Sequence, residues 1–301
     1  MTRHETTVDR PWPNNTELAL GLAQMGCGPG VVNSSVALGH RSIRISHAKP
    51  NETKSLVLLR QRTADLRHNL SLDEEEAVLS FLWRSAPASA VKSVGFMSLQ
   101  GGGEKFLVTD FLEGPTLAEI LPPKEHPDEV LSILESSLAT IHRAGLMPQR
   151  PALNRVNSVE RILGRMQYSP LGDIAQWSDV KARLEASLFR TREFTILHGD
   201  PHAFNLICPF TREAGKGTWL DFEFSSLGPP EMDLAKSLLQ TSLQAERAVA
   251  PPGRRTSSEW ALVLFVCGEW MAEPPRDARP TAHSVVRQIA KDASCALNKL
   301  Q

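Results

Sequence analysis

The chain has 301 residues, with 33 Lys and Arg against 34 Asp and Glu, a formal net charge of −1 at pH 7 and 41% hydrophobic residues. This composition is globular and supplies enough material for one large or two modest folded units, so it excludes a disordered or collagen-like chain. Because the charges balance, no bulk attraction to nucleic acid or to an anionic membrane is implied, and a small-molecule ligand is favoured.

The sequence contains no pattern typical of export or membrane insertion. The longest apolar run, residues 260–267, has eight residues, less than half of the roughly 20 that a bilayer span requires. Residues 1–15 are polar and contain Pro, so we expect them to be flexible and expect the protein to be cytoplasmic. The cysteines lack CxxC spacing, which is typical of reduced, mostly buried thiols: Cys27, Cys208, Cys267 and Cys295.

The N-terminal part of the chain is mainly strand-like. Residues 41–47 alternate between polar and apolar, while residues 55–60 and 106–112 are short apolar runs bounded by turn residues. Residues 92–100 read as a further strand, and Gly101, Gly102 and Gly103 predict a turn after it. These segments predict one antiparallel sheet.

Helical patterns interrupt and then follow these strands. Residues 72–84 begin with acidic residues, which suit the positive end of a helix, and continue with apolar residues at helical spacing. Residues 127–144 open with Pro, carry one apolar face and stop at Gly145. Further helices are predicted over residues 157–168, 179–189, 231–247, 257–271 and 282–299. The chain therefore reads as an α+β protein with a β-rich lobe over residues 1–113 and a larger, mostly helical lobe over residues 114–301.

The chemistry is concentrated in the stretch TILHGDPHAFNLI, residues 195–207. Asp200 and Asn205 in this stretch have the spacing of the catalytic loop of kinases, and Asp221 follows beyond a hairpin-like break, where a second metal-binding Asp belongs. Phosphoryl transfer depends mainly on positioning and on neutralising spread negative charge by hard cations, which prefer carboxylate and amide oxygens. We therefore assign Asp200 to the substrate hydroxyl, and Asn205 and Asp221 to a metal ion.

The segments HGDPHAFNL and WLDFEFSSLGPPEMDLA resemble the signature of the aminoglycoside phosphotransferase and choline kinase family. This resemblance implies a bilobal, protein-kinase-like fold, ATP or GTP with Mg²⁺ as cofactors, and a small-molecule hydroxyl as acceptor. It implies Asp200 as catalytic base, Asn205 and Asp221 as magnesium ligands, His198 as a buttress of the loop and Asp233 as a structural partner. Glu223 is either a solvated loop residue or a further metal or substrate contact.

The same resemblance extends more faintly to the nucleotide site. FLVTDFLEGPTL, residues 106–117, is similar to the family's hinge, whose backbone groups pair with adenine, so Asp110, Phe111 and Leu112 are expected at the base. LATIHRAG, residues 138–145, is similar to the helix end that precedes the substrate region.

A strand cation and a helix carboxylate are expected to form an ion pair at the phosphates, as in protein kinases. VLLR, residues 57–60, places Arg60 where those kinases have Lys, with Arg62 as a rival. Glu76 is the expected partner, and Glu75 is its rival because a shift of one residue turns a helix by about 100°.

A glycine-rich stretch precedes the predicted sheet. MGCGPGVVNSS, residues 25–35, offers backbone N–H groups that could cover phosphates, with hydroxyl contacts from Ser34 and Ser35. A glycine-rich stretch of this kind is a plain turn more often than a phosphate cradle, so only its position in the chain supports this role.

Other functions remain open from the residues alone. His198, Asp200 and His202 form an HxDxH pattern that suits a metal-dependent hydrolase, and a nucleotide-binding pseudokinase regulator is a second alternative. A protein kinase is disfavoured because the chain lacks an APE-like segment.

The acceptor is expected to lie against residues 146–194 and 240–290. Neither window has the acidic excess that a polycationic aminoglycoside favours. Trp177, Trp260 and Trp270 could form a cage for a quaternary amine, although tryptophans on helices usually belong to a core. A natural-product hydroxyl, in self-resistance or biosynthesis, is therefore the leading expectation, with antibiotics included.

Overall fold

The computed structural model describes residues 11–38, 41–61, 70–99, 104–145, 182, 195–208, 217–275 and 278–300. The predicted helices over residues 157–168 and 179–189 lie outside the described residues, apart from residue 182. The predicted glycine turn at residues 101–103, Arg62 and Trp177 lie outside them as well.

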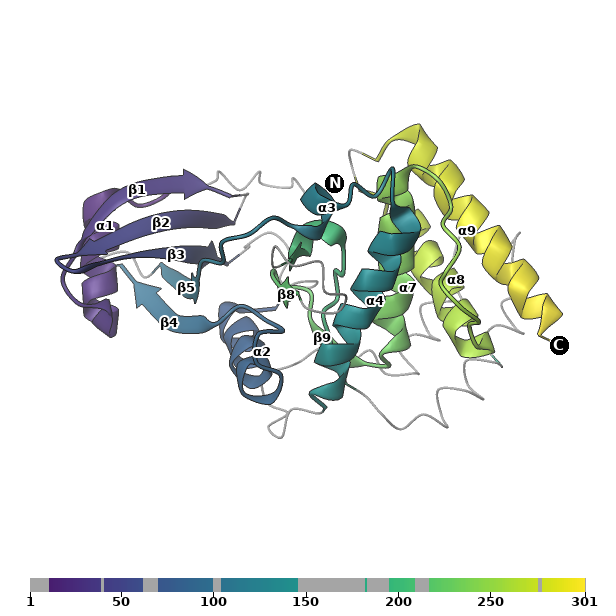
Figure 1. The fold of residues 1–301 in the computed structure, drawn as a ribbon, viewed down its shortest axis with the longest axis horizontal. Helices are drawn as coiled ribbons and strands as arrows, with labels where there is room; N and C mark the ends of the chain where they lie inside the picture. The colour runs from purple at the N-terminus through teal and green to yellow at the C-terminus, as the bar shows by residue number, and fades with distance from the viewer. Residues whose placement is uncertain are drawn as a thin grey trace, which may run out of the picture.

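A five-stranded antiparallel sheet forms the N-terminal lobe (Figure 1). The order across the sheet is β1 (Val31–Ala37), β2 (Ser42–Lys49), β3 (Glu52–Arg60), β5 (Lys105–Asp110) and β4 (Ser93–Ser98). Four of these strands confirm the expected sheet. Strand β1 was not expected, because its one buried side chain, Val32, leaves no alternating pattern in the sequence.

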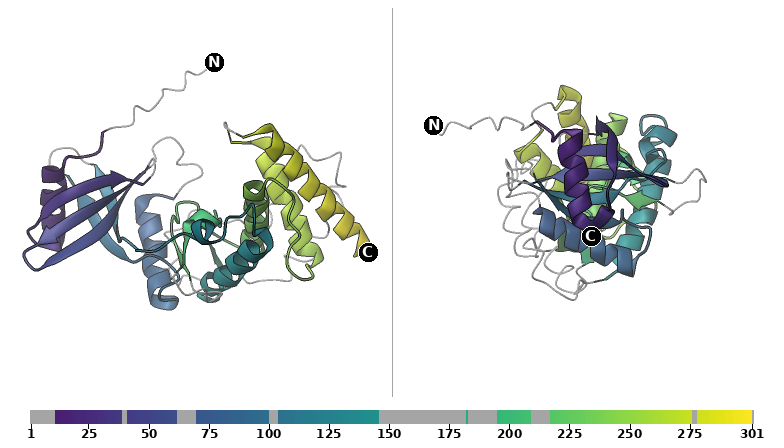
Figure 2. Two further views of the ribbon diagram at one scale, coloured as in Figure 1. Left: turned by 45° about the horizontal axis from the view of Figure 1, so that its top comes forward. Right: turned by 90° about the vertical axis from the view of Figure 1, so that its left-hand side faces the viewer.

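A helix packs on each face of this sheet. Helix α1 (Asn15–Leu22) begins at a capping box formed by Asn14 and Glu17, and Leu18 and Leu22 pack against the sheet residues Ile43, Ile45, Leu56, Leu58, Phe106 and Val108. Figure 2 shows α1 at the end of the molecule away from the helical lobe. Helix α2 (Leu72–Ser85), predicted over residues 72–84, packs instead with Leu107 and with residues of the helical lobe.

The second lobe is mainly helical, as predicted. In the part of this lobe that the structure describes, the helices are α3 (Leu117–Ile120), α4 (Pro127–Arg143), α7 (Glu231–Ala245), α8 (Ser257–Ala272) and α9 (Pro280–Lys299). Helix α8 is apolar over most of its circumference because it packs against both α7 and α9 (Figure 1). Trp260 and Trp270 pack against this helical core.

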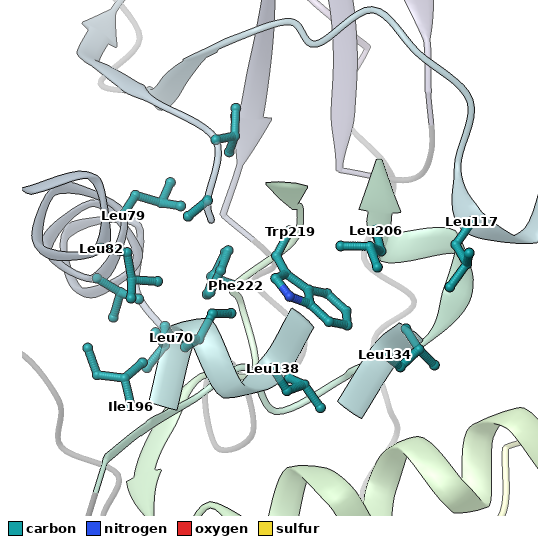
Figure 3. Close-up of a cluster of buried hydrophobic side chains, with 14 of the residues drawn as sticks. Leu70, Leu79, Leu82, Leu117, Leu134, Leu138, Ile196, Leu206, Trp219 and Phe222 are labelled. Carbon is teal, nitrogen blue, oxygen red and sulfur yellow. The ribbon is translucent and has the colours of Figure 1, made fainter. Parts of the chain in front are cut away.

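Short strands and a turn of 3₁₀ helix carry the two motif segments between α4 and α7. β6 (Thr195–Leu197) pairs with β9 (Ser226–Gly228), and β7 (Leu206–Ile207) pairs with β8 (Thr218–Trp219), with the turn Ala203–Asn205 just before β7. Figure 3 shows Trp219 and Phe222 in one buried cluster with Leu79 and Leu82 of α2 and Leu134 and Leu138 of α4. The segments that bear the motifs therefore rest on a core shared by both lobes.

Two further findings concern expectations from composition. No helix in the described part of the chain combines the length and apolar character that a membrane span requires. All four cysteines lie among the described residues, and each is a free thiol.

Candidate active site

The loop that follows β6 is fixed by one buried carboxylate. Asp233, in the first turn of α7, accepts hydrogen bonds from the backbone N–H groups of His198 at 2.8 Å and Gly199 at 3.0 Å. The Nε2 atom of His142, at the end of α4, lies 3.0 Å from the same carboxylate. Burial alone would raise the pKa of Asp233, but the hydrogen bond and charge of His142, with those of the loop, lower it below its usual range. Asp233 thus ties α4 and α7 to the loop.

His198 connects the Asp200 loop to the segment that carries Asp221. Its ring lies between Trp219 and Phe222, with both centroid distances 4.7 Å. Nε2 lies 2.8 Å from the carbonyl oxygen of Leu220, and Nδ1 accepts a hydrogen bond from the N–H of Asp200. Burial lowers the pKa of His198, so the neutral ring with a proton on Nε2 satisfies both contacts. This is the geometry of a loop buttress.

Gly199 shows why the motif requires glycine at its centre. Its φ of +89° is left-handed, and a Cβ there would lie 2.0 Å from the carbonyl oxygen of Phe224. Its own carbonyl accepts a hydrogen bond of 2.6 Å from Lys236 on α7. The chain therefore reverses tightly and presents Asp200.

The side chains of Gln240 and His202 hold the carboxylate of Asp200. Gln240 of α7 donates a hydrogen bond of 3.3 Å to Oδ1, and Nε2 of His202 lies 3.4 Å from Oδ2. Burial would raise the pKa of Asp200, but the hydrogen bond and charge of His202, together with His198 and Lys236, lower it. Asp200 is therefore an ionised carboxylate in a partly buried site. Gln240 carries no signal in the sequence, because its role depends on the packing of α7 under the loop.

Asn205 links Asp200 to the segment that carries Asp221. Its side-chain amide nitrogen donates a hydrogen bond of 3.1 Å to the backbone carbonyl oxygen of Asp200. Its own backbone carbonyl oxygen accepts a hydrogen bond of 2.8 Å from the N–H of Leu220. Asp221 follows in the left-handed conformation, with φ of 57°, and its side chain is 37% exposed. The structure thus brings Asp200, Asn205 and Asp221 together, as the motif spacing predicted.

A buried arginine completes the site from the sheet lobe. Nη2 of Arg41, the residue before β2, lies 2.6 Å from Oε1 and 2.8 Å from Oε2 of Glu75 on α2. The same atom lies 3.3 Å from Oδ1 of Asp221, and Nε lies 3.5 Å from Oε2 of Glu223. Glu223 is therefore a buried partner of Arg41 and not a solvated loop residue.

The predicted ion pair of Arg60 with Glu76 is wrong. Leu56, Leu58 and Arg60 alternate along β3 onto the face that α1 covers, and there Arg60 lies 2.7 Å from Glu104 and stacks on Trp12. Glu76 accepts a hydrogen bond of 2.5 Å from Ser80. The rival Glu75 is the carboxylate that faces the site, and it pairs with Arg41, which directly precedes β2. Arg41 was missed because it precedes the strand, where alternation no longer fixes direction.

The structure does not bring the predicted phosphate loop beside Asp200, Asn205 and Asp221. Gly26 and Gly28 precede β1, and β1 begins at the end of the sheet away from the helical lobe (Figure 1). Ser34 and Ser35 lie within β1, exposed, opposite Ser46 and Ile45 of β2. Gly26 and Gly28 thus lie in the segment before β1, and the two serines belong to a strand that the sequence did not predict.

The segment expected to bind adenine connects the lobes directly after β5. Asp110 lies 2.7 Å from Lys54, the N–H of Phe111 donates to the carbonyl of Ser55, and Leu112 packs against the shared core. A cavity of about 470 Å³ flanks Leu112 on the side of α4 and β8, and none of Asp200, Asn205 and Asp221 lines it.

The metal-hydrolase alternative does not fit this geometry. Both ring nitrogens of His198 are engaged by the backbone, so this ring is not placed to bind a metal ion together with Asp200 and His202. Within the described ranges, no group of three His, Cys, Asp or Glu side chains is arranged to hold a metal ion.

Comparison with known proteins identifies the family and the fold of the chain. A model of the phosphotransferase enzyme family matches residues 43–261. The search of curated proteins found no match.

Solved structures share the fold at low identity. The GDP complex of an aminoglycoside 2'-phosphotransferase-IIIa is 11% identical over 94% of this chain and 99% of its own, with a TM-score of 0.55. An amicoumacin kinase in complex with AMP-PNP and Ca²⁺ is 13% identical over 87% of each chain, with a TM-score of 0.52. A choline/ethanolamine kinase family protein from Mesorhizobium loti is 13% identical over 94% and 99%, with a TM-score of 0.52.

Proposed function

The chain belongs to the phosphotransferase enzyme family and is a small-molecule kinase with a bilobal fold, and on this premise we propose that it phosphorylates a hydroxyl group of a small molecule with ATP or GTP. The observation that carries the proposal is the network that joins Asp200, Asn205 and Asp221 through Leu220 and His198. We place the boundary between the nucleotide lobe and the acceptor lobe near residue 113.

Asp200 is the proposed catalytic base. Its ionised carboxylate accepts a hydrogen bond from the acceptor hydroxyl and orients the oxygen lone pair towards the γ-phosphorus. A bond forms between this oxygen and phosphorus while the bond to the β-phosphate oxygen breaks. The hydroxyl proton passes to Asp200, and the nucleoside diphosphate leaves. Gln240 and His202 hold the carboxylate in place from opposite oxygens.

The residues present suit Mg²⁺. Oδ1 of Asp221 is buried without a hydrogen-bond partner among the described residues, and Arg41 is shared between Asp221 and two further carboxylates, Glu75 and Glu223. Carboxylate and amide oxygens are the ligands that Mg²⁺ prefers, so Asp221 and Asn205 would hold it. When bound, the ion would neutralise charge on the phosphates.

The nucleotide base is proposed to meet the backbone of Asp110, Phe111 and Leu112. Because the N–H of Phe111 is already bonded to Ser55, the carbonyl of Asp110 and the N–H of Leu112 are the groups proposed to bind a purine. The related structures contain GDP in one case and AMP-PNP in another, which supports testing both purines.

The test is a screen for nucleoside diphosphate release. Purified protein is incubated with Mg²⁺ and either ATP or GTP across hydroxylated metabolites, aminoglycosides and other natural-product antibiotics, with Asp200→Asn as the control for background hydrolysis. We expect acceptor-dependent release by the wild-type protein and a phosphorylated product by mass spectrometry. Nucleotide binding without transfer to any acceptor would instead favour the pseudokinase alternative.

A further inference from the structure

Arg41 is a buried cation that contacts carboxylates of both lobes in the described site. Its side chain is 8% exposed, and its guanidinium lies between Glu75 of α2 and the segment that carries Asp221 and Glu223. An unpaired buried charge is costly, so an arginine is retained here only with partners that satisfy it. Both carboxylate oxygens of Glu75 contact Nη2 of Arg41, at 2.6 and 2.8 Å, and these charge-assisted contacts anchor that end of the guanidinium.

The partners of Arg41 are unequal. Glu75 and Glu223 are buried, whereas the Asp221 side chain is more than one third exposed. The contact with Asp221 is also the longer of the two made by Nη2, at 3.3 Å, and it lacks hydrogen-bond geometry at Oδ1. Nε of Arg41 has no hydrogen-bond partner among the described residues. Arg41 therefore has a firm anchor in Glu75, a loose contact with the proposed metal ligand Asp221, and spare donor capacity at Nε, which faces Glu223.

We propose that Arg41 is the cation that holds the nucleotide phosphates, with Glu75 as its positioning residue, in place of an arginine or lysine from β3. This inference rests on the proposed function, because it assumes that a nucleoside triphosphate enters at Asp221. The geometry excludes Arg60 from this task, since Arg60 lies on the face of the sheet covered by α1, against Trp12 and Glu104.

Arg41 lies opposite Arg60 at the end of the β2–β3 pair, but it precedes β2, so strand alternation does not hold its side chain on the face of Arg60. The backbone N–H of Arg60 donates a hydrogen bond of 2.8 Å to the carbonyl oxygen of Arg41, so the two residues are adjacent where β2 begins and β3 ends. A cation supplied from the start of β2 therefore enters at the same level of the sheet as Arg60, while its side chain reaches Glu75 on α2. Arg41 therefore supplies the cation at the proposed phosphate site, while Arg60 of β3 lies on the other face of the sheet.

The experiment compares Arg41→Gln with Arg60→Gln as the matched control. Binding of AMP-PNP, of GMP-PNP and of the unphosphorylated nucleosides is measured by calorimetry with Mg²⁺ present. Because a hydrogen bond between charged groups is strong, we expect Arg41→Gln to weaken triphosphate binding by about 10- to 100-fold and nucleoside binding by less than about twofold. Arg60→Gln should keep triphosphate affinity within about twofold, and Arg41→Lys should restore part of what Arg41→Gln loses.

The design separates a local effect from misfolding. If Arg41→Gln alone does not fold, as judged by its melting transition, the double variant Arg41→Gln/Glu75→Gln removes the charges of the pair together and takes its place in the assay. Unchanged triphosphate affinity in the Arg41 variants, or a selective loss in Arg60→Gln, overturns the inference while leaving the proposed function intact. A wild-type protein that binds neither triphosphate overturns both.

Discussion

The carboxylate of Asp233 on α7 accepts a hydrogen bond of 2.8 Å from the backbone N–H of His198, 35 residues earlier in the chain. The adjacent N–H of Gly199 donates to the other carboxylate oxygen, so a single side chain satisfies two successive donors of a tight loop. Because the next residue is Asp200, the position of the proposed base depends on a residue that does not belong to its own segment.

Asp233→Asn should destabilise the fold. The amide has one acceptor oxygen where the carboxylate has two, so a buried N–H loses its partner and the interaction with His142 loses its charge. We expect the free energy of unfolding in urea to fall by about 3 kcal/mol. Asp128→Asn, an exposed acidic residue in the first turn of α4, is the matched control and should cost about 0.5 kcal/mol. Equal losses in the two variants would contradict the structural role of Asp233.

The same carboxylate should make stability depend on pH. Its pKa is lowered in the folded protein, so its contribution is fully present above the unfolded pKa of about 3.9 and is lost as the pH falls through the folded value. We therefore expect the difference in unfolding free energy between wild type and Asp233→Asn to shrink as the pH is lowered from about 6 to about 3. Urea titrations at a series of pH values measure this difference, and a constant gap would contradict the lowered pKa.

Asp200→Asn should separate chemistry from binding. The amide keeps an acceptor for Gln240 but cannot take the proton of the acceptor hydroxyl. We expect kcat to fall by about 10² to 10⁴ fold while the affinity for the metal–nucleotide complex changes little. Steady-state kinetics and calorimetry on the same preparations provide the two readouts. A kcat within about threefold of wild type would place the base elsewhere.

Motif spacing and periodicity were sufficient for much of this fold. Four sheet strands and α2, α4, α7, α8 and α9 follow from local patterns, because each buries a regular face. The spacing of Asp200 and Asn205 predicted their proximity because both lie in one short loop. Helix α1 and strand β1 could not be predicted in this way, since one is only eight residues long and the other is almost wholly exposed.

The sequence did not show which of two nearby charged residues faces the site. Glu75 and Glu76 differ only in which face of α2 they occupy, and that face is set by packing against β5 and the helical lobe. Arg41 and Arg60 are neighbours across two strands, but only one guanidinium reaches α2. Such outcomes depend on tertiary contacts that a local pattern does not contain.

Asp221→Asn tests the proposed metal ligand with two effects of opposite sign. Asn tolerates the left-handed backbone that Asp221 adopts, so the change removes charge without adding strain. With Mg²⁺ present, we expect triphosphate affinity to fall by about tenfold or more, because a carboxylate ligand is lost. With EDTA, affinity should stay equal or rise, because one negative charge near the phosphates is removed and Arg41 is released from a carboxylate neighbour. Calorimetric titration of AMP-PNP under both conditions measures the two effects, and an equal loss in the presence and absence of Mg²⁺ would show that Asp221 does not act through the metal ion.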